Sequence, residues 1–322
     1  MVGNQGEAMS SVSNKVTWWD ATSTAGPAVA ELAGNLIIAW RGNQNSRNLT
    51  VANVTGSAGG LAGTALRPTV LSDSSDHAPA LSRTLTTGYT AQLAWAGING
   101  AHSLNVADLG VDTSAWQLTG RVVGRALVAG GSVSATSGPV WTGAGHSDVN
   151  QLGVLDQNSR SVLIEETGDL VFGAPSTSEF IFDARGPAQA RDTDDGETLW
   201  AWTASDGALT FALVRQGFPL PAAVVKSAQS SGFGPSSIEQ AYPGGPLCIA
   251  WTGIDGAGEL NVAPVNPDAI RNGTDPVGAV YTLPETSIAA PTLLYRPLLD
   301  ALAIFWAGTD GAGTLNGCNV QL

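Results

Sequence analysis

The chain has 322 residues, of which 43% are hydrophobic, and its 40 Gly and 17 Pro are spread along the whole length. Glycine and proline at this density interrupt helices and supply turns, while the apolar content suffices for a large core; a helical or disordered chain is therefore not expected. The net charge of −13, with 14 Lys and Arg in total, leaves no basic stripe for nucleic acid and disfavours anionic membrane surfaces.

Residues 1–14 are mostly small and polar and lack the apolar segment of a signal peptide. The mature chain begins here, the protein is cytoplasmic, or export uses another route; the sequence leaves these alternatives open. No apolar run approaches the roughly 20 residues that span a bilayer, so membrane insertion is not expected.

One phrase recurs along the chain: an apolar strand, Trp, a small residue, Gly, a polar turn, and then Leu-Asn-Val or a variant. The aligned tryptophans are Trp40, Trp95, Trp141, Trp202, Trp251 and Trp306. Their spacing of 46 to 61 residues is close to the repeat of a four-stranded propeller blade, roughly 40 to 50 residues. Several copies carry Asp-Gly or Asn-Gly in the turn, which tolerate the positive φ of tight hairpins. The third copy is degenerate, with Gly-Ala-Gly-His at 143–146.

These repeats predict an all-β fold in one domain over residues 1–322, a six-bladed β-propeller of four-stranded antiparallel blades. The blades are expected at residues 25–73, 76–125, 126–175, 180–228, 236–284 and 288–322. Residues 15–20 align with an outer strand that has no blade before it, and the sixth unit lacks a fourth strand. The N-terminal strand is therefore predicted to complete the last blade beside residues 315–320, which removes two sheet edges. A solenoid is the competing architecture, and these matching ends argue against it.

The phrase at residues 250–262, Ala-Trp-Thr-Gly-Ile-Asp-Gly-Ala-Gly-Glu-Leu-Asn-Val, resembles the repeats of bacterial β-propeller lectins, and all six units carry some version of it. The resemblance implies a non-enzymatic carbohydrate-binding protein with several sites between blades, where an aromatic ring stacks on the sugar and a polar side chain holds its hydroxyls. The expected partners are glycans or a glycoprotein, bound multivalently. Residues 203–211 are similar to the Asp-box of sialidases, which is a structural hairpin.

The candidate ligand-binding residues are the six repeat tryptophans together with Asn105, Asn261, Asp255 and Asp310. Each has a structural alternative. The tryptophans are in register with Leu and Ile, so they would equally pack between blades. The asparagines would bond to backbone, and the aspartates would close their own turns. Outside the repeat, Trp18 and Trp19 point to opposite faces of their strand, so at most one is buried in the same way.

Catalysis has little support, because His77, His102 and His146 belong to different units and show no nucleophile spacing. No cofactor and no metal site are expected, and Cys248 and Cys318 are interpreted as buried free thiols, since no histidine partners lie near them. The acidic run at 192–197 is interpreted as a solvated loop. The alternative functions are a protein-interaction or assembly-subunit propeller and, less favoured, a glycoside hydrolase or sialidase-like enzyme. Oligomerisation stays open.

Overall fold

The computed structural model is built almost entirely from antiparallel strands, with one short helix, α1 (Pro267–Arg271), among the described residues. The structure describes residues 11–32, 35–42, 47–56, 60–83, 91–98, 104–112, 115–123, 133–135, 141–144, 152–155, 161–164, 169–171, 177–179, 189–193, 195–204, 206–215, 223–254 and 256–322. Within these ranges no helix is long and apolar enough to cross a membrane.

The strands form six sheets, numbered here in chain order from the sheet that contains β2. The first contains β2 (Ala28–Leu32), β3 (Asn35–Arg41), β4 (Asn48–Thr55) and β5 (Ala65–Ser74). The second contains β6 (Ala80–Arg83), β7 (Ala91–Ala96), β8 (Leu104–Asp112) and β9 (Ala115–Val123). The third contains β10 (Val133–Ala135), β11 (Trp141–Ala144), β12 (Leu152–Leu155), β13 (Ser161–Ile164), β14 (Asp169–Val171) and β15 (Thr177–Glu179). The fourth contains β16 (Gln189–Asp192), β17 (Glu197–Thr203), β18 (Ala208–Arg215) and β19 (Ala223–Ser230). The fifth contains β20 (Glu239–Gln240), β21 (Leu247–Thr252), β22 (Glu259–Val265) and β23 (Tyr281–Thr286). The sixth contains β24 (Thr292–Arg296), β25 (Ala301–Ala307), β26 (Thr314–Gln321) and β1 (Ser11–Thr22).

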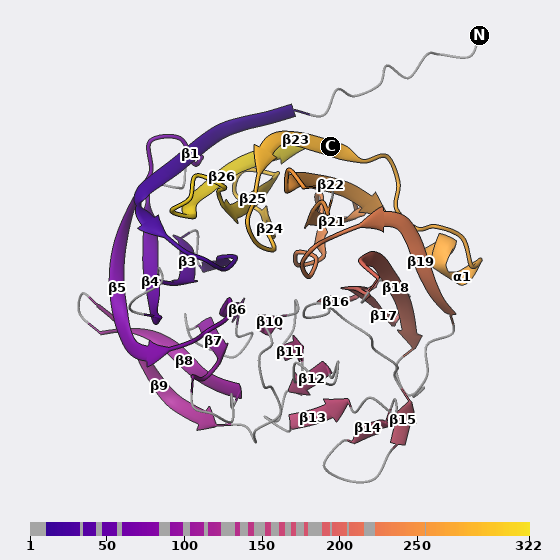
Figure 1. Ribbon diagram of the computed structural model, residues 1–322, viewed down its shortest axis with the longest axis horizontal. Helices are drawn as coiled ribbons and strands as arrows, with labels where there is room; N and C mark the ends of the chain where they lie inside the picture. The colour runs from indigo at the N-terminus through magenta and orange to yellow at the C-terminus, as the bar shows by residue number, and fades with distance from the viewer. Residues whose placement is uncertain are drawn as a thin grey trace.

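Figure 1 shows the sheets arranged around a common centre, with first strands such as β6, β10 and β24 nearest to it and outer strands such as β5, β9 and β19 at the rim. The fold is thus all-β and propeller-like, with four-stranded antiparallel sheets, as the repeat predicted. The third sheet departs from the expected four strands, because β14 and β15 extend it to six. The interval from Trp141 to Trp202 is the longest between repeat tryptophans, and part of the extra chain forms this additional hairpin.

Four apolar clusters of the described residues lie between neighbouring sheets, and the first, fifth and sixth sheets contribute apolar residues from both of their faces. In β21, Leu247, Ile249 and Trp251 belong to the cluster shared with the fourth sheet. The alternate residues Cys248 and Ala250 belong to the cluster shared with the sixth. Small residues on one sheet therefore face bulky ones on the next, which is how stacked sheets fill their interfaces.

The strand β1 pairs antiparallel with β26, in a register that sets Val16 opposite Gly317 and Trp18 opposite Leu315. In the sixth sheet the N-terminal strand consequently lies outermost, beside the C-terminal strand (Figure 1). The Trp18 side chain is 6% exposed and stacks on Phe305, with ring centroids 6.5 Å apart. Since Trp18 also joins the cluster between the sixth and first sheets, β1 contributes to that interface as well as to its own sheet.

A buried serine marks each described junction between consecutive sheets. The four are Ser23, Ser75, Ser231 and Ser287. The Ser231 N–H donates to Gly207 O of the fourth sheet at 2.8 Å, and its hydroxyl donates to Thr252 O of the fifth at 2.8 Å. Ser287 joins the fifth sheet to the sixth in the same way, through Gly258 O and Ala307 O. Each of these serines stands four residues before a proline.

Candidate functional site

The structure buries five of the six repeat tryptophans, and four of them, Trp40, Trp95, Trp251 and Trp306, belong to the apolar clusters between sheets. Trp95, Trp251 and Trp306 are each 1% exposed, and Trp40 and Trp202 are each 4% exposed. A ring with this little free surface has no face open to a sugar, so its burial supports the packing alternative. The side chain of Trp141, on β11, lies outside the described residues.

Two of the four predicted polar candidates, Asn261 and Asp310, are hydrogen-bonded within their own sheets. Asn261 donates from its amide nitrogen to Glu259 O at 3.1 Å and accepts from the Thr282 hydroxyl at 2.7 Å. The carboxylate of Asp310 accepts from three backbone N–H groups of its own turn, at 2.8 to 3.2 Å. A side-chain hydrogen bond from Thr314, and after it these backbone bonds, lower the pKa of this carboxyl. Asn105 is 2% exposed on β8, and Asp255 lies outside the described residues. In the described candidates, these contacts fit the structural alternatives.

A cavity of about 460 Å³ lies between the fourth and fifth sheets, at the end of the strands opposite to the Asp-Gly turns. It is lined by residues of the β16–β17 turn, the β20–β21 turn and the β22–β23 connection. The hydrogen-bonding side chains among them are Thr193, Asp195, Gln240 and Asn266. Pro246, Leu247, Pro264, Val265 and Pro267 supply the apolar part of the wall. This volume and this mixture of surfaces are typical of small-molecule sites.

The helix α1 contributes Pro267 to the wall of this cavity. The residues at its two ends favour a helix here. The Asn266 side chain accepts from the Asp268 N–H at 3.0 Å, Pro267 occupies the first turn, and Arg271 stands in the last turn. Ile270 is fully buried in the cluster between the fourth and fifth sheets and holds the helix in place. Farther along the same connection, Asp275 accepts from Ser227 Oγ at 3.0 Å and from Ala228 N at 2.8 Å, both on β19. The connection of the fifth sheet is thereby fastened to the fourth.

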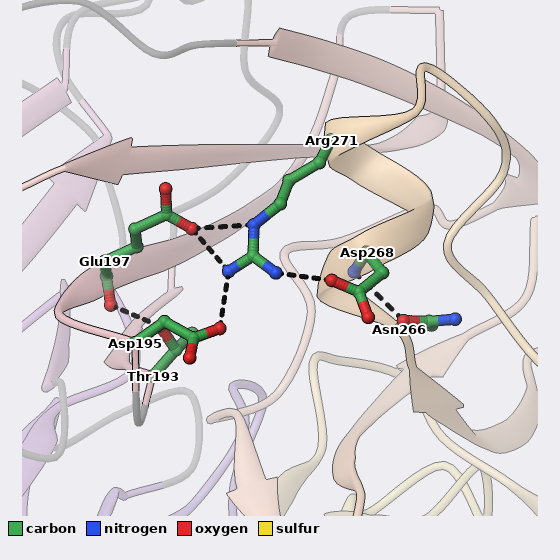
Figure 2. Close-up of polar contacts among 6 residues, drawn as sticks. All are labelled: Thr193, Asp195, Glu197, Asn266, Asp268 and Arg271. Atoms are coloured by element: carbon green, nitrogen blue, oxygen red, sulfur yellow. Dashed lines mark hydrogen bonds and ion pairs between the residues drawn. The ribbon is translucent and has the colours of Figure 1, made fainter.

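Arg271 reaches from α1 to the β16–β17 turn, and Figure 2 shows its guanidinium among three carboxylates. Its Nε and Nη2 donate to Glu197 Oε2 at 3.0 and 2.6 Å, and Nη2 also donates to Asp195 Oδ2 at 2.8 Å. Nη1 bonds to Asp268. These bonds, the one to Glu197 foremost, raise the pKa of Arg271 above its ordinary value.

Of the acidic run at 192–197, interpreted from the sequence as a solvated loop, Asp195 is 69% exposed, in keeping with that interpretation, whereas Glu197 is 12% exposed. Both carboxylates form an ion-pair cluster with Arg271 in the connection of the next sheet. The sequence could not reveal it, because Arg271 is more than 70 residues away along the chain.

Two further expectations concern thiols and metals. Cys248 and Cys318 are free and buried, as predicted, and burial raises the pKa of each to about 12, so the thiolate form is disfavoured at neutral pH. Among the residues that the structure describes, no group of three His, Cys, Asp or Glu is placed to hold a metal ion.

No family model and no curated protein sequence matches the chain. Solved structures resemble it in fold at low identity. A sialidase of Trypanosoma rangeli superimposes with a TM-score of 0.56 and 10% identity, covering 97% of this chain and 60% of the sialidase. The SapL1 lectin in complex with alpha methyl fucoside has a TM-score of 0.55 and 12% identity, covering 92% of this chain and 93% of the lectin. A mutant Aleuria aurantia lectin in complex with alpha-methyl-L-fucoside has a TM-score of 0.54 and 10% identity, covering 95% and 96%. The chain therefore spans about three fifths of the sialidase and nearly the whole of each lectin, and these likenesses establish the propeller-like fold.

Proposed function

We propose that this protein is a closed six-bladed β-propeller that binds carbohydrate and does not catalyse a reaction on it. The cavity between the fourth and fifth sheets is the observation on which the proposal rests. Its lining combines hydroxyl-, amide- and carboxylate-bearing residues with proline and aliphatic residues, and a sugar ring presents surfaces of both kinds, hydroxyl groups at its edge and C–H groups on its faces.

The closed ring is the architectural part of the proposal. Each sheet is one blade, and β1 serves as the outer strand of the sixth blade because it pairs with β26. Closure leaves every blade with a neighbour on both sides, so that all the apolar faces are covered.

A binding protein is favoured over a hydrolase by the chemistry of the cavity. Most glycoside hydrolases use a pair of carboxyl groups, one of them free to donate a proton. Asp195, the carboxylate among the lining residues, accepts a hydrogen bond from Arg271, an arrangement that suits binding and positioning better than proton transfer.

The proposal assigns the repeat tryptophans to packing between blades and moves the ligand contacts to the cavity. A glycan array probed with the full chain tests binding, and isothermal titration with each hit measures its affinity. We expect Gln240→Ala to weaken the strongest hit about fivefold to tenfold, since one hydrogen bond to a ligand contributes roughly 1 kcal/mol. Gln240→Trp should abolish binding by filling the space.

Lys226→Gln on the rim of the fourth sheet is the matched control, because Lys226 pairs with Asp206 at the other end of the strands. An empty array, or equal binding by all variants, would contradict the proposal. Release of the chromophore from an aryl glycoside would favour the hydrolase instead.

A further inference from the structure

The first sheet departs from the repeat at two positions that flank its turn between β3 and β4. When the units are aligned on their tryptophans and on the leucine of the following strand, Arg41 stands where the fifth and sixth units have Thr252 and Ala307. Arg47 stands where the fourth, fifth and sixth units have glycine. No other unit has arginine at either position.

The backbone at Arg47 keeps the conformation that glycine adopts in the other units. Its φ is +47°, against +89° at Gly207, +68° at Gly258 and +68° at Gly313. A residue with a side chain in this left-handed region costs roughly 1–2 kcal/mol. Its carbonyl still accepts from the serine of the next junction, Ser75, at 2.9 Å, so glycine would serve the fold better. The arginine side chain is therefore retained against a conformational cost.

Both arginines converge on Asp76, which follows the junction serine Ser75. Arg47 Nη1 lies 2.9 Å from Asp76 Oδ1, and Arg41 Nη2 lies 4.0 Å from the same oxygen. Arg41 also bonds to Thr24 in the preceding junction. Its side chain is 14% exposed, and its buried Nε finds no hydrogen-bond partner among the described residues.

Two guanidinium groups thus face the single carboxylate of Asp76 in these contacts, in a protein whose net charge is −13. Burial lowers the pKa of Arg41, and it outweighs the opposing effect of Asp76, so this cation is under-compensated. Joining the sheets requires no such cluster. At the junction of the fifth and sixth sheets, Thr252 makes the corresponding link with one hydrogen bond of 2.7 Å to Ala289 O.

We infer that Arg41 and Arg47 form a binding site for an oxyanion, the carboxylate or sulfate group of an acidic saccharide, at the junction of the first and second sheets. A planar guanidinium binds such groups through paired N–H donors, and the Arg47 side chain, 52% exposed, has donors that a ligand can reach beside Arg41. The identification of the ligand as a saccharide rests on the proposed function, whereas the oxyanion site rests on these residues alone.

Titration of the full chain with glucuronate and glucose 6-sulfate, with glucose as the neutral match, tests this inference, and inorganic sulfate is the probe without a sugar. We expect both acidic sugars to bind at least tenfold more tightly than glucose, with an affinity that falls as salt is raised. Arg47→Gly restores the residue of the other units, so it should reduce this affinity at least tenfold without lowering the midpoint of thermal unfolding. Arg41→Thr should have the same effect on binding, and Arg67→Gln, at an exposed position of β5, should have none.

Equal affinity of wild type and Arg47→Gly for the acidic sugars, or no preference over glucose, would overturn the inference. If glycans still bind on the array in that case, the proposed function stands. Binding of inorganic sulfate that Arg47→Gly abolishes, together with an empty array, would support the oxyanion site and contradict both the saccharide ligand and the proposed function.

Discussion

Adjacent tryptophans at the N-terminus show how the alternation of a strand decides the role of a residue. Trp18 is 6% exposed and packs on Phe305, whereas Trp19, the next residue of β1, is 74% exposed. Residue type and sequence position are almost the same for the two rings, so their difference is the face of the strand on which they lie. A structural role can therefore be separated from a surface role by substituting one and then the other.

Replacement of the two tryptophans should have very different consequences for stability. Trp18→Ala should lower the free energy of unfolding by about 3–5 kcal/mol, since it leaves a cavity between the sixth and first sheets. Trp19→Ala should change it by less than about 0.5 kcal/mol, as expected for an exposed position. Denaturant titration followed by circular dichroism measures both. Similar losses for the two variants would mean that β1 does not pack with Trp18 inward.

At the scale of single elements, the turn between the second and third strands of a sheet carries the link to the following sheet. In the sixth sheet, Asp310 closes this turn, and Gly313 O accepts from Ser23 N at 2.9 Å. A Cβ atom on Gly313 would lie 1.9 Å from Ser23 O, but one on Gly311 would meet nothing within 4 Å. Both glycines have positive φ, +68° and +79°, so they differ in the space around them and not in backbone type.

Alanine at these two glycines separates the cost of the backbone from that of the junction. Gly311→Ala should lose roughly 1–2 kcal/mol, the cost of a left-handed alanine. Gly313→Ala should lose more than about 3 kcal/mol, because the added carbon displaces Ser23 and breaks its hydrogen bond as well. Chemical denaturation at neutral pH provides the comparison. Equal losses would indicate that the turn relaxes to the geometry that Arg47 adopts in the first sheet. The close approach of residue 313 to Ser23 O would then add nothing to the loss of stability.

At the scale of the whole molecule, the repeat carried most of what could be predicted. Internal alignment predicts the strand alternation around Trp251 and the pairing partner of residues 15–20. It does so because the aligned strands pack against neighbouring sheets in the same way. The repeat does not predict α1, the cavity beside it or the clustering of carboxylates around Arg271, since these depend on an insertion in one unit meeting a turn in another. The repeat also does not predict the six strands of the third sheet, because this unit is the longest and its sequence is the least regular. Arg41 and Arg47 differ in sequence from the residues at the matching positions of the other units. Their convergence on Asp76 depends on the fold and could not be predicted from the sequence.

The strand β1 brings the N-terminus to the end of the chain, and the proposed ring depends on that contact. Deletion of residues 1–22 would remove three members of the cluster between the sixth and first sheets, Val16, Trp18 and Ala21, and would expose an edge of β26. We expect the truncated chain to lose its cooperative unfolding transition or to aggregate.

A synthetic peptide of residues 11–22, added in trans during refolding, should restore the transition by strand addition, and the same peptide with Trp18→Ala should not. Deletion of residues 1–10 leaves β1 intact and is the matched control. Unchanged stability of the longer truncation would show that the ring does not require β1, in which case the sixth blade functions with three strands.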